Sequence, residues 1–218
     1  DSEQAALSVI NGGHPVVLRA GLLPNDRIWL PDAALESDEK VELLINPLEE
    51  MAAPVKLSNG TQIRPAELTL KLKEAAALLR QSPAERGFHA CVQQFPLSRG
   101  PLLTKALPLQ RALYLASSVS QLVSVNFWLG DGGLRSGLHF DPNDNLLLQL
   151  RGEKTLLLFP PNVSEGFGLY APSFERRYTF DAAAARVTGH RAARGAPIEN
   201  HAAVDVFAPS TAEEGGGR

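Results

Sequence analysis

The chain is 218 residues long, which fits one domain, because globular domains average about 150 residues. Hydrophobic residues make up 44% and charged residues 21% of the chain, a composition that supports a packed core and excludes an intrinsically disordered protein. The net charge of -3 provides no basic field for phosphate backbones, so we expect no nucleic-acid partner.

Cys91 is the single cysteine, and one thiol cannot form an internal disulfide. The sequence contains no apolar run long enough to span a bilayer and no charged leader followed by an apolar segment. We therefore expect no membrane association and a cytoplasmic or nuclear location.

Short β-branched apolar runs predict strands in the N-terminal part of the chain, residues 1–121. The first run, residues 14–19, follows three turn-forming residues, and the second, residues 41–46, is closed by a proline. Residues 88–95 form a third run. This part of the chain is therefore expected to combine strands with helices.

Thr69 can cap a helix whose apolar residues recur at the spacing of one buried stripe, namely Leu72, Ala75, Ala76 and Leu79. The dipeptide Ser82-Pro83 predicts the end of this helix. Residues 101–118 mix apolar and polar residues and are predicted to form a loop with a short helix.

Strand-like runs separated by short turns fill the middle of the chain, residues 122–181, and predict consecutive hairpins. The runs are residues 123–129, 134–141, 145–150 and 154–159. This pattern favours a sandwich or barrel over a βαβ fold. Residues 182–218 are rich in Ala and Gly and contain no Leu, so we expect them to be largely loop or disordered.

His139 and Asp141 are separated by one residue, and in a strand this spacing places both side chains on one face. An imidazole and a carboxylate are part of the ligand set of non-haem iron, which uses two histidines and one carboxylate. The same spacing is typical of a histidine at a strand end followed by a turn-opening aspartate. The spacing alone leaves both interpretations open.

Asn145 and Lys154 each open one of the next two predicted strands, so a compact sheet would bring an amide and an ammonium near His139 and Asp141. Such groups hold a small dicarboxylate by hydrogen bond and charge. A lysine that follows a hairpin turn can equally face water. The pattern favours neither interpretation.

Three segments together resemble the Jumonji-C, cupin-like branch of the iron(II) and 2-oxoglutarate dependent oxygenases. They are VNFWLGD, LHFDPNDNL and RGEKTLLLFPP, at residues 125–131, 138–146 and 151–161. Within that branch the sequence is most similar to the bifunctional peptidase and (3S)-lysyl hydroxylase group, and next to the asparaginyl hydroxylase that inhibits hypoxia-inducible factor. The likeness is specific over residues 125–161 and looser along the rest of the chain.

The resemblance implies a mainly β (α+β) fold: a cupin-type double-stranded β-helix, or jelly roll, with flanking helices, in one domain over residues 1–218. It implies that His139 and Asp141 bind Fe(II), that Lys154 pairs with the distal carboxylate of 2-oxoglutarate, and that Asn145 and Ser136 assist this cosubstrate. The implied activity is protein hydroxylation of the lysyl hydroxylase type, on a protein substrate. The oligomeric state stays open, with a dimer among the options.

The sequence departs from the family pattern at two places. Cys91 occupies a position where relatives often carry a tyrosine that binds the cosubstrate, and we interpret it as a small buried thiol on a strand. The family takes its third metal ligand from a late strand, and no matching segment follows Pro209. We therefore expect a jelly roll that is incomplete at its C-terminus, in a truncated form of such an enzyme.

The remaining histidines are weaker candidates. His190 and His201 lie in the Ala-rich region without strand alternation and are predicted to be surface residues, while His14 and His89 are expected to be structural or solvent-facing. Two other functions remain in view: a catalytically inactive cupin-fold binding module, and a cupin metal enzyme that does not use 2-oxoglutarate.

Overall fold

The computed structural model describes residues 8, 15–17, 32–48, 55–56, 61–107, 109–160, 169–170, 174–194, 198–202 and 206. Its helices are α2 (Asp32–Leu35), α3 (Leu72–Arg80), α4 (Pro83–Arg86), the 3-10 helix η1 (Leu97–Arg99), α5 (Pro101–Ala106) and α6 (Gln110–Val119). Its strands are β1 (Lys40–Pro47), β2 (Val55–Lys56), β3 (Thr61–Arg64), β4 (Ala66–Lys71), β5 (Phe88–Pro96), β6 (Asn126–Gly130), β7 (Leu169–Tyr170), β8 (Phe174–Asp181), β9 (Arg186–Arg194) and β10 (Ile198–Ala202).

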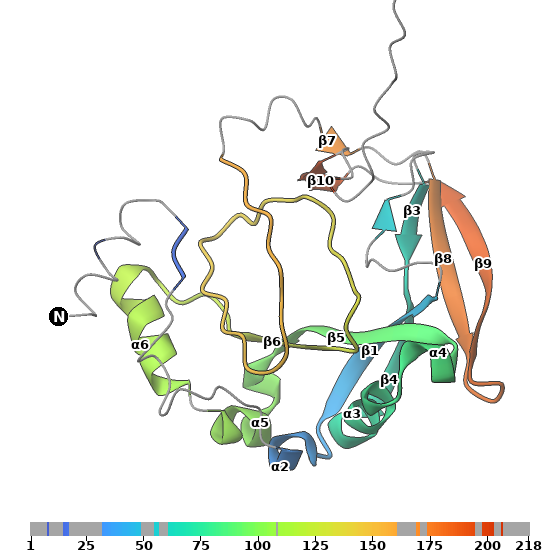
Figure 1. The fold of residues 1–218 in the computed structure, drawn as a ribbon, viewed down its shortest axis with the longest axis horizontal. Coiled ribbons are helices and arrows are strands. Elements are labelled where there is room, and N and C mark those ends of the chain that lie inside the picture. The colour runs from blue at the N-terminus through green and yellow to red at the C-terminus, as the bar shows by residue number, and fades with distance from the viewer. Residues whose placement is uncertain are drawn as a thin grey trace, which may run out of the picture.

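A four-stranded antiparallel sheet has the order β4-β1-β5-β6 (Figure 1). A second four-stranded sheet has the order β2-β3-β8-β9, in which β3 and β8 are parallel, and β10 pairs with β7 in a two-stranded sheet. Short helices flank these sheets. The expected mainly β architecture with flanking helices is therefore confirmed.

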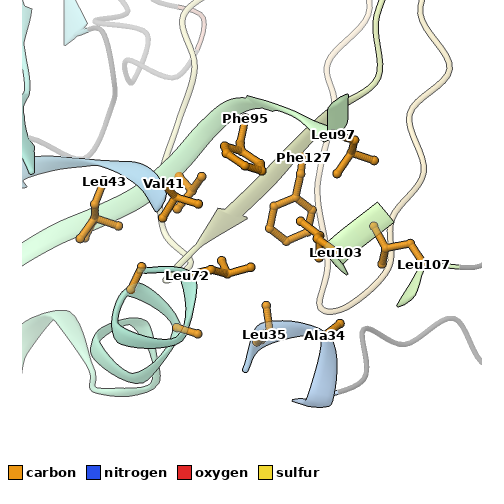
Figure 2. Close-up of a cluster of buried hydrophobic side chains, with 14 of the residues drawn as sticks. Ala34, Leu35, Val41, Leu43, Leu72, Phe95, Leu97, Leu103, Leu107 and Phe127 are labelled. Carbon is orange, nitrogen blue, oxygen red and sulfur yellow. The ribbon is translucent and has the colours of Figure 1, made fainter. Parts of the chain in front are cut away.

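The hydrophobic core lies between the first sheet and the helices (Figure 2). Strand alternation turns Val41, Leu43 and Ile45 of β1 toward this side, and all three are buried. Helix α3 packs against them through its buried residues Leu72, Ala75 and Ala76. Figure 1 shows α2, α3 and α5 on one side of the sheet and the chain that follows β6 on the other. In the described ranges no helix has the length and apolar character needed to cross a bilayer.

The expected strands at residues 41–46 and 88–95 are confirmed as β1 and β5. The predicted helix also forms, but it begins at Leu72, because Thr69 still pairs with Glu42 as part of β4. At the start of the helix the backbone N–H of Lys71 donates to the Glu74 carboxylate, 3.0 Å away, so Lys71 and not Thr69 is the N-terminal cap residue.

Other predicted elements differ in extent. Residues 101–118 hold two helices, α5 and α6, where a loop with one short helix was expected. The strand predicted over residues 123–129 begins only at Asn126. Of the strand predicted over residues 14–19, only residues 15–17 are described, and they have no regular secondary structure.

The hairpins predicted between residues 134 and 159 are not observed as strands. Apart from isolated bridges at Arg135 and His139, residues 131–160 follow an irregular path. Strand β6 ends the order of its sheet, and no described strand pairs with it on the far side. Alternating side chains favour an extended chain, but a strand also needs a neighbouring strand for its N–H and C=O groups, and none of the described strands lies there.

The expectation of loop or disorder over residues 182–218 is wrong for the strands β9 and β10. Strand β9 pairs antiparallel with β8 from Arg186 to Arg194, with one register shift. Backbone hydrogen bonds need no particular side chains, so an Ala-rich segment extends the sheet once β8 provides a partner. Beyond β10 only Val206 is described.

Candidate metal and cosubstrate site

His139 and Asp141 lie next to each other on the chain that follows β6. The distance from His139 Nε2 to Asp141 Oδ1 is 3.8 Å, and the side chains are 35% and 50% exposed. His139 Nδ1 lies 2.7 Å from the carbonyl oxygen of Gly137. Because a carbonyl only accepts, Nδ1 carries the hydrogen in this contact, and Nε2 is the ring nitrogen nearest Asp141. A metal bound at Nε2 requires the ring hydrogen on Nδ1, as here.

Asn145 holds the other oxygen of the same carboxylate. Its Nδ2 donates to Asp141 Oδ2 at 2.6 Å and lies 3.3 Å from the carbonyl oxygen of Asn143. These contacts orient the Asp141 carboxylate so that Oδ1 faces His139. The structure thus brings His139, Asp141 and Asn145 together, with Asn145 bound to Asp141, and the role of each in binding a metal or cosubstrate stays a prediction.

Lys154 lies at a second place, over the indole ring of Trp128. Its Nζ is 5.7 Å from the ring centroid, within the range of a cation–π contact. Trp128 is 43% exposed, while its neighbour Phe127 is buried in the core. Strand alternation therefore places Trp128 and Lys154 on the side of β6 that faces away from the helices. Ser136, three residues before His139, is exposed.

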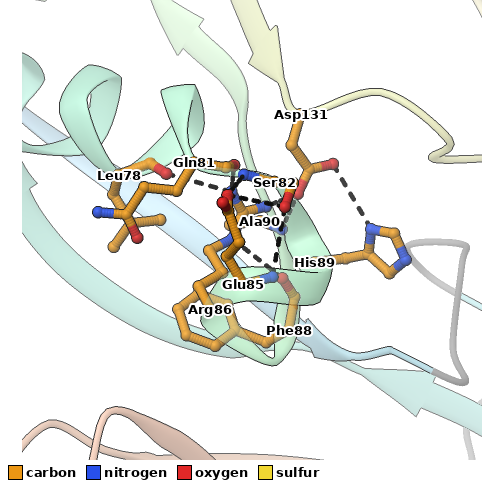
Figure 3. A network of polar contacts seen from close by, with 9 residues as sticks. All are labelled: Leu78, Gln81, Ser82, Glu85, Arg86, Phe88, His89, Ala90 and Asp131. Carbon is orange, nitrogen blue, oxygen red and sulfur yellow. Dashed lines mark hydrogen bonds and ion pairs between the residues drawn. The ribbon is translucent and has the colours of Figure 1, made fainter.

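Arg86, His89 and Asp131 form a buried polar cluster beside β5 that the sequence did not reveal (Figure 3). An Arg86–Asp131 ion pair has side chains only 3% and 0% exposed, and His89 Nδ1 lies 3.6 Å from Asp131 Oδ1. Burial, and secondly the charge of Arg86, lower the pKa of His89, so its ring is neutral near pH 7. His89 is thus buried beside a carboxylate, although its sequence neighbours offer none.

The expected burial of Cys91 is confirmed. It lies on β5 opposite Leu44 of β1 and Gly130 of β6. Burial raises the pKa of its thiol to about 11, partly offset by a hydrogen bond with Gln93. Such a thiol is a packing residue and not a nucleophile at neutral pH.

A third metal ligand is absent from the part of the chain that the structure describes, where no group of three or more His, Cys, Asp or Glu side chains could hold a metal ion. His190 lies on β9 and His201 on β10. His14 lies outside the described residues. Of the metal donors predicted from the sequence, the structure therefore places two, His139 and Asp141, side by side.

The fold is mainly β, and the His139–Asp141 pair lies beyond the end of β6, the edge strand of its sheet. The chain belongs to the cupin-like domain family, whose pattern matches residues 8–213, and the predicted cupin fold class is thereby confirmed. Over 43 residues it is also 44% identical to "Lysine-specific demethylase JMJ31" of Arabidopsis thaliana. This match covers 20% of the chain and 8% of the plant protein. It links the chain to the Jumonji-C type of cupin, while the lysyl hydroxylase group named by the resemblance remains a proposal.

Proposed function

We propose that the protein is an iron(II) and 2-oxoglutarate dependent oxygenase that hydroxylates a residue of a partner protein. The observation that carries this proposal is the His139–Asp141 pair, with Nε2 and Oδ1 facing each other inside a cupin-like domain. Lysine is the proposed target residue, by resemblance alone. A cytoplasmic or nuclear location belongs to the proposal, because a lone thiol and an iron(II) cofactor suit a reducing compartment.

The donor pair fits a divalent transition metal. Two donors that bind one ion at about 2.1 Å and at right angles lie about 3.0 Å apart. His139 Nε2 and Asp141 Oδ1 are 3.8 Å apart and partly exposed, so a small side-chain adjustment brings both to one ion. An imidazole nitrogen with a carboxylate oxygen is also the donor combination that non-haem iron prefers.

Each residue of the site has a defined task in this proposal. His139 and Asp141 hold the iron, Asn145 keeps the Asp141 carboxylate in orientation, and Lys154 pairs with the distal carboxylate of 2-oxoglutarate, with Ser136 as a further hydrogen-bond donor. When bound, the metal and the oxo acid supply oxygen activation, in which 2-oxoglutarate and O₂ yield succinate and carbon dioxide while one oxygen atom enters a C–H bond.

A second candidate is a cupin-fold binding module without catalysis. It is favoured by the absence of a three-ligand group among the described residues and by a run of exposed apolar side chains at Leu156, Leu157 and Leu158. A cupin metal enzyme that uses no 2-oxoglutarate would share the His139–Asp141 pair but would not need Lys154.

Calorimetric titration of 2-oxoglutarate into protein loaded with Mn²⁺, an oxygen-inert substitute for iron(II), separates these candidates. Lys154→Ala should weaken binding about ten- to a hundredfold, the cost of one charge-assisted hydrogen bond, and leave Mn²⁺ binding intact. Lys105→Ala, which removes an exposed lysine from α5, is the matched control and should have no effect. His139→Ala should abolish Mn²⁺ binding.

The outcomes are distinct. Equal affinity for 2-oxoglutarate in wild type and Lys154→Ala removes Lys154 from the site. Mn²⁺ binding without 2-oxoglutarate binding favours the other metal enzyme, and binding of neither favours the module. Succinate formation that depends on a protein or peptide substrate would then test turnover directly.

A further inference from the structure

Three backbone carbonyl oxygens bind the Arg86 guanidinium, in addition to the carboxylate of Asp131. Its Nε donates to the carbonyl oxygen of Phe88 at 3.0 Å, and its Nη1 donates to those of Gln81 at 2.6 Å and Leu78 at 3.1 Å. The guanidinium also lies 5.4 Å from the centroid of the Phe88 ring. These contacts fix the guanidinium plane and direct Nη2 toward the turn that follows β6 (Figure 3).

The Asp131 carboxylate accepts a hydrogen bond from Arg86 Nη2 and also binds a backbone N–H at the end of the sheet. The last pair between β5 and β6 is Cys91 with Gly130, so Ala90 has no strand partner on that side. The N–H of Ala90 instead donates to Asp131 Oδ2 at 2.8 Å, on the same oxygen that accepts from Arg86. The Asp131 carboxylate therefore accepts the hydrogen bond that a further residue of β6 would otherwise accept from Ala90. The side chain of Asp131 is completely buried.

The turn that begins at Asp131 has a second fixed point at Leu134. A Cβ atom on Gly130 would lie only 3.2 Å from Leu134 Cδ1, so the leucine folds back over the end of β6. Gly132 and Gly133, with φ of 84° and 72°, allow the reversal between them. The chain thus leaves β6 with both ends of a four-residue turn fixed, five residues before His139.

We infer that Arg86 and Asp131 are positioning residues for the His139–Asp141 pair. The clamp formed by Arg86, Asp131 and the Ala90 N–H sets where residues 132–145 start relative to the sheet. Without the clamp, this segment would lose its fixed starting point on the sheet, since apart from isolated bridges at Arg135 and His139 residues 131–160 form no strand. The inference rests on the proposed function for the metal, and on geometry alone for the ordering of the segment.

The test uses the full chain and two readouts, Mn²⁺ affinity by electron paramagnetic resonance and hydrogen exchange of residues 132–145 by mass spectrometry. The double variant Arg86→Met/Asp131→Leu removes both buried charges with similar volume, which commonly preserves folding. We expect it to fold, to lose about tenfold in Mn²⁺ affinity and to exchange faster over residues 132–145, as loss of a supporting contact typically does. Arg86→Lys keeps the positive charge but lacks the several N–H groups of the planar guanidinium. If the double variant does not fold, the same two readouts are measured on Arg86→Lys.

Lys73→Met/Asp38→Leu is the matched control, because this ion pair, 2.7 Å long, is exposed and lies on the helix side of the sheet. It should change neither readout. A folded clamp variant with wild-type exchange and wild-type Mn²⁺ affinity would show that the pair only stabilises the fold, and would overturn the inference. If the wild type binds no Mn²⁺, the proposed function falls, and the exchange of residues 132–145 alone decides whether the clamp orders them.

Discussion

His89 Nδ1 and Asp131 Oδ1 face each other across 3.6 Å, and both are buried atoms without a hydrogen-bond partner in the described part of the chain. The other carboxylate oxygen of Asp131 is taken by Arg86 and Ala90. A protonated His89 would place a second cation beside the Arg86 guanidinium. The neutral ring is therefore the form that this cluster accommodates.

Acid should destabilise the protein through His89. Its folded pKa is lowered by burial and by Arg86, so between that pKa and the unfolded value of about 6.5 the unfolded state binds more protons. The contribution of neutral His89 is fully present above the unfolded pKa and is lost as the pH falls below it, at no more than about 1.4 kcal/mol per pH unit. Urea unfolding between pH 7.5 and about 5.5 should show a smaller loss in His89→Gln than in wild type. Parallel pH curves for the two proteins would contradict this.

Cys91 should be chemically inert in the folded protein. Its thiol is buried and its pKa is raised to about 11, so almost no thiolate exists at neutral pH. Ellman's reagent should leave the native protein unmodified at pH 8 and react with one thiol in urea. Rapid labelling under native conditions would mean that β5 opens locally or that Cys91 is not packed as described.

Helix α5 provides a matched pair of leucines for measuring the core. Leu103 is fully buried, whereas its neighbour Leu102 is 61% exposed. Leu103→Ala should lower the free energy of unfolding by about 2–5 kcal/mol, because it removes packed methyl groups and leaves a cavity. Leu102→Ala should cost less than about 0.5 kcal/mol. Denaturant unfolding of both variants measures the contrast, and similar losses in the two would refute the packing of α5.

The exposed leucines near Lys154 should bind a hydrophobic dye. Leu156, Leu157 and Leu158 are 55%, 47% and 65% exposed on consecutive residues, and such runs are sites of association. Leu158→Lys should reduce fluorescence of anilinonaphthalene sulfonate and aggregation, with a stability change within about 0.5 kcal/mol. A large loss of stability would instead show that Leu158 is packed in solution. Leu103→Lys, which buries a charge, is the variant expected to unfold.

Local patterns predicted strands β1 and β5 and helix α3, but not strand β4, whose Thr69 was expected to cap the helix. The runs at residues 41–46 and 88–95 form strands with mostly buried side chains, and of the predicted helix stripe Leu72, Ala75 and Ala76 are buried while Leu79 is half-buried. The hairpins between residues 134 and 159 depend on a partner strand, which no local pattern encodes. Strand β9 was not predicted, because its Ala-rich side chains give no strand signal. It forms because β8 provides a partner for its backbone hydrogen bonds.

The candidate site divides in the same way. The spacing of His139 and Asp141 predicted their proximity, but nothing in the sequence paired Asp131 with Arg86, which is 45 residues away. An aspartate within Gly130-Asp131-Gly132-Gly133 has the residue pattern of an exposed turn. Asp131 is buried because β6 ends at Gly130 and leaves the N–H of Ala90 without a strand partner on that side, so the carboxylate accepts from it. The register of the sheet, which the sequence does not show, reveals this N–H.

The parallel pairing of β3 with β8 joins Thr61 to Phe174, two residues far apart in the sequence. Until the ribosome has released β8, the hairpin of β2 and β3 has no third strand, and a lone two-stranded ribbon is marginal in water. The sheet of β4, β1, β5 and β6 is complete by Gly130 and can form on the nascent chain. Synthesis should therefore yield first a chain in which only the sheet of β4, β1, β5 and β6 is folded, while the sheet of β2, β3, β8 and β9 forms after β8 has emerged. A translational pause before Phe174 would prolong that state.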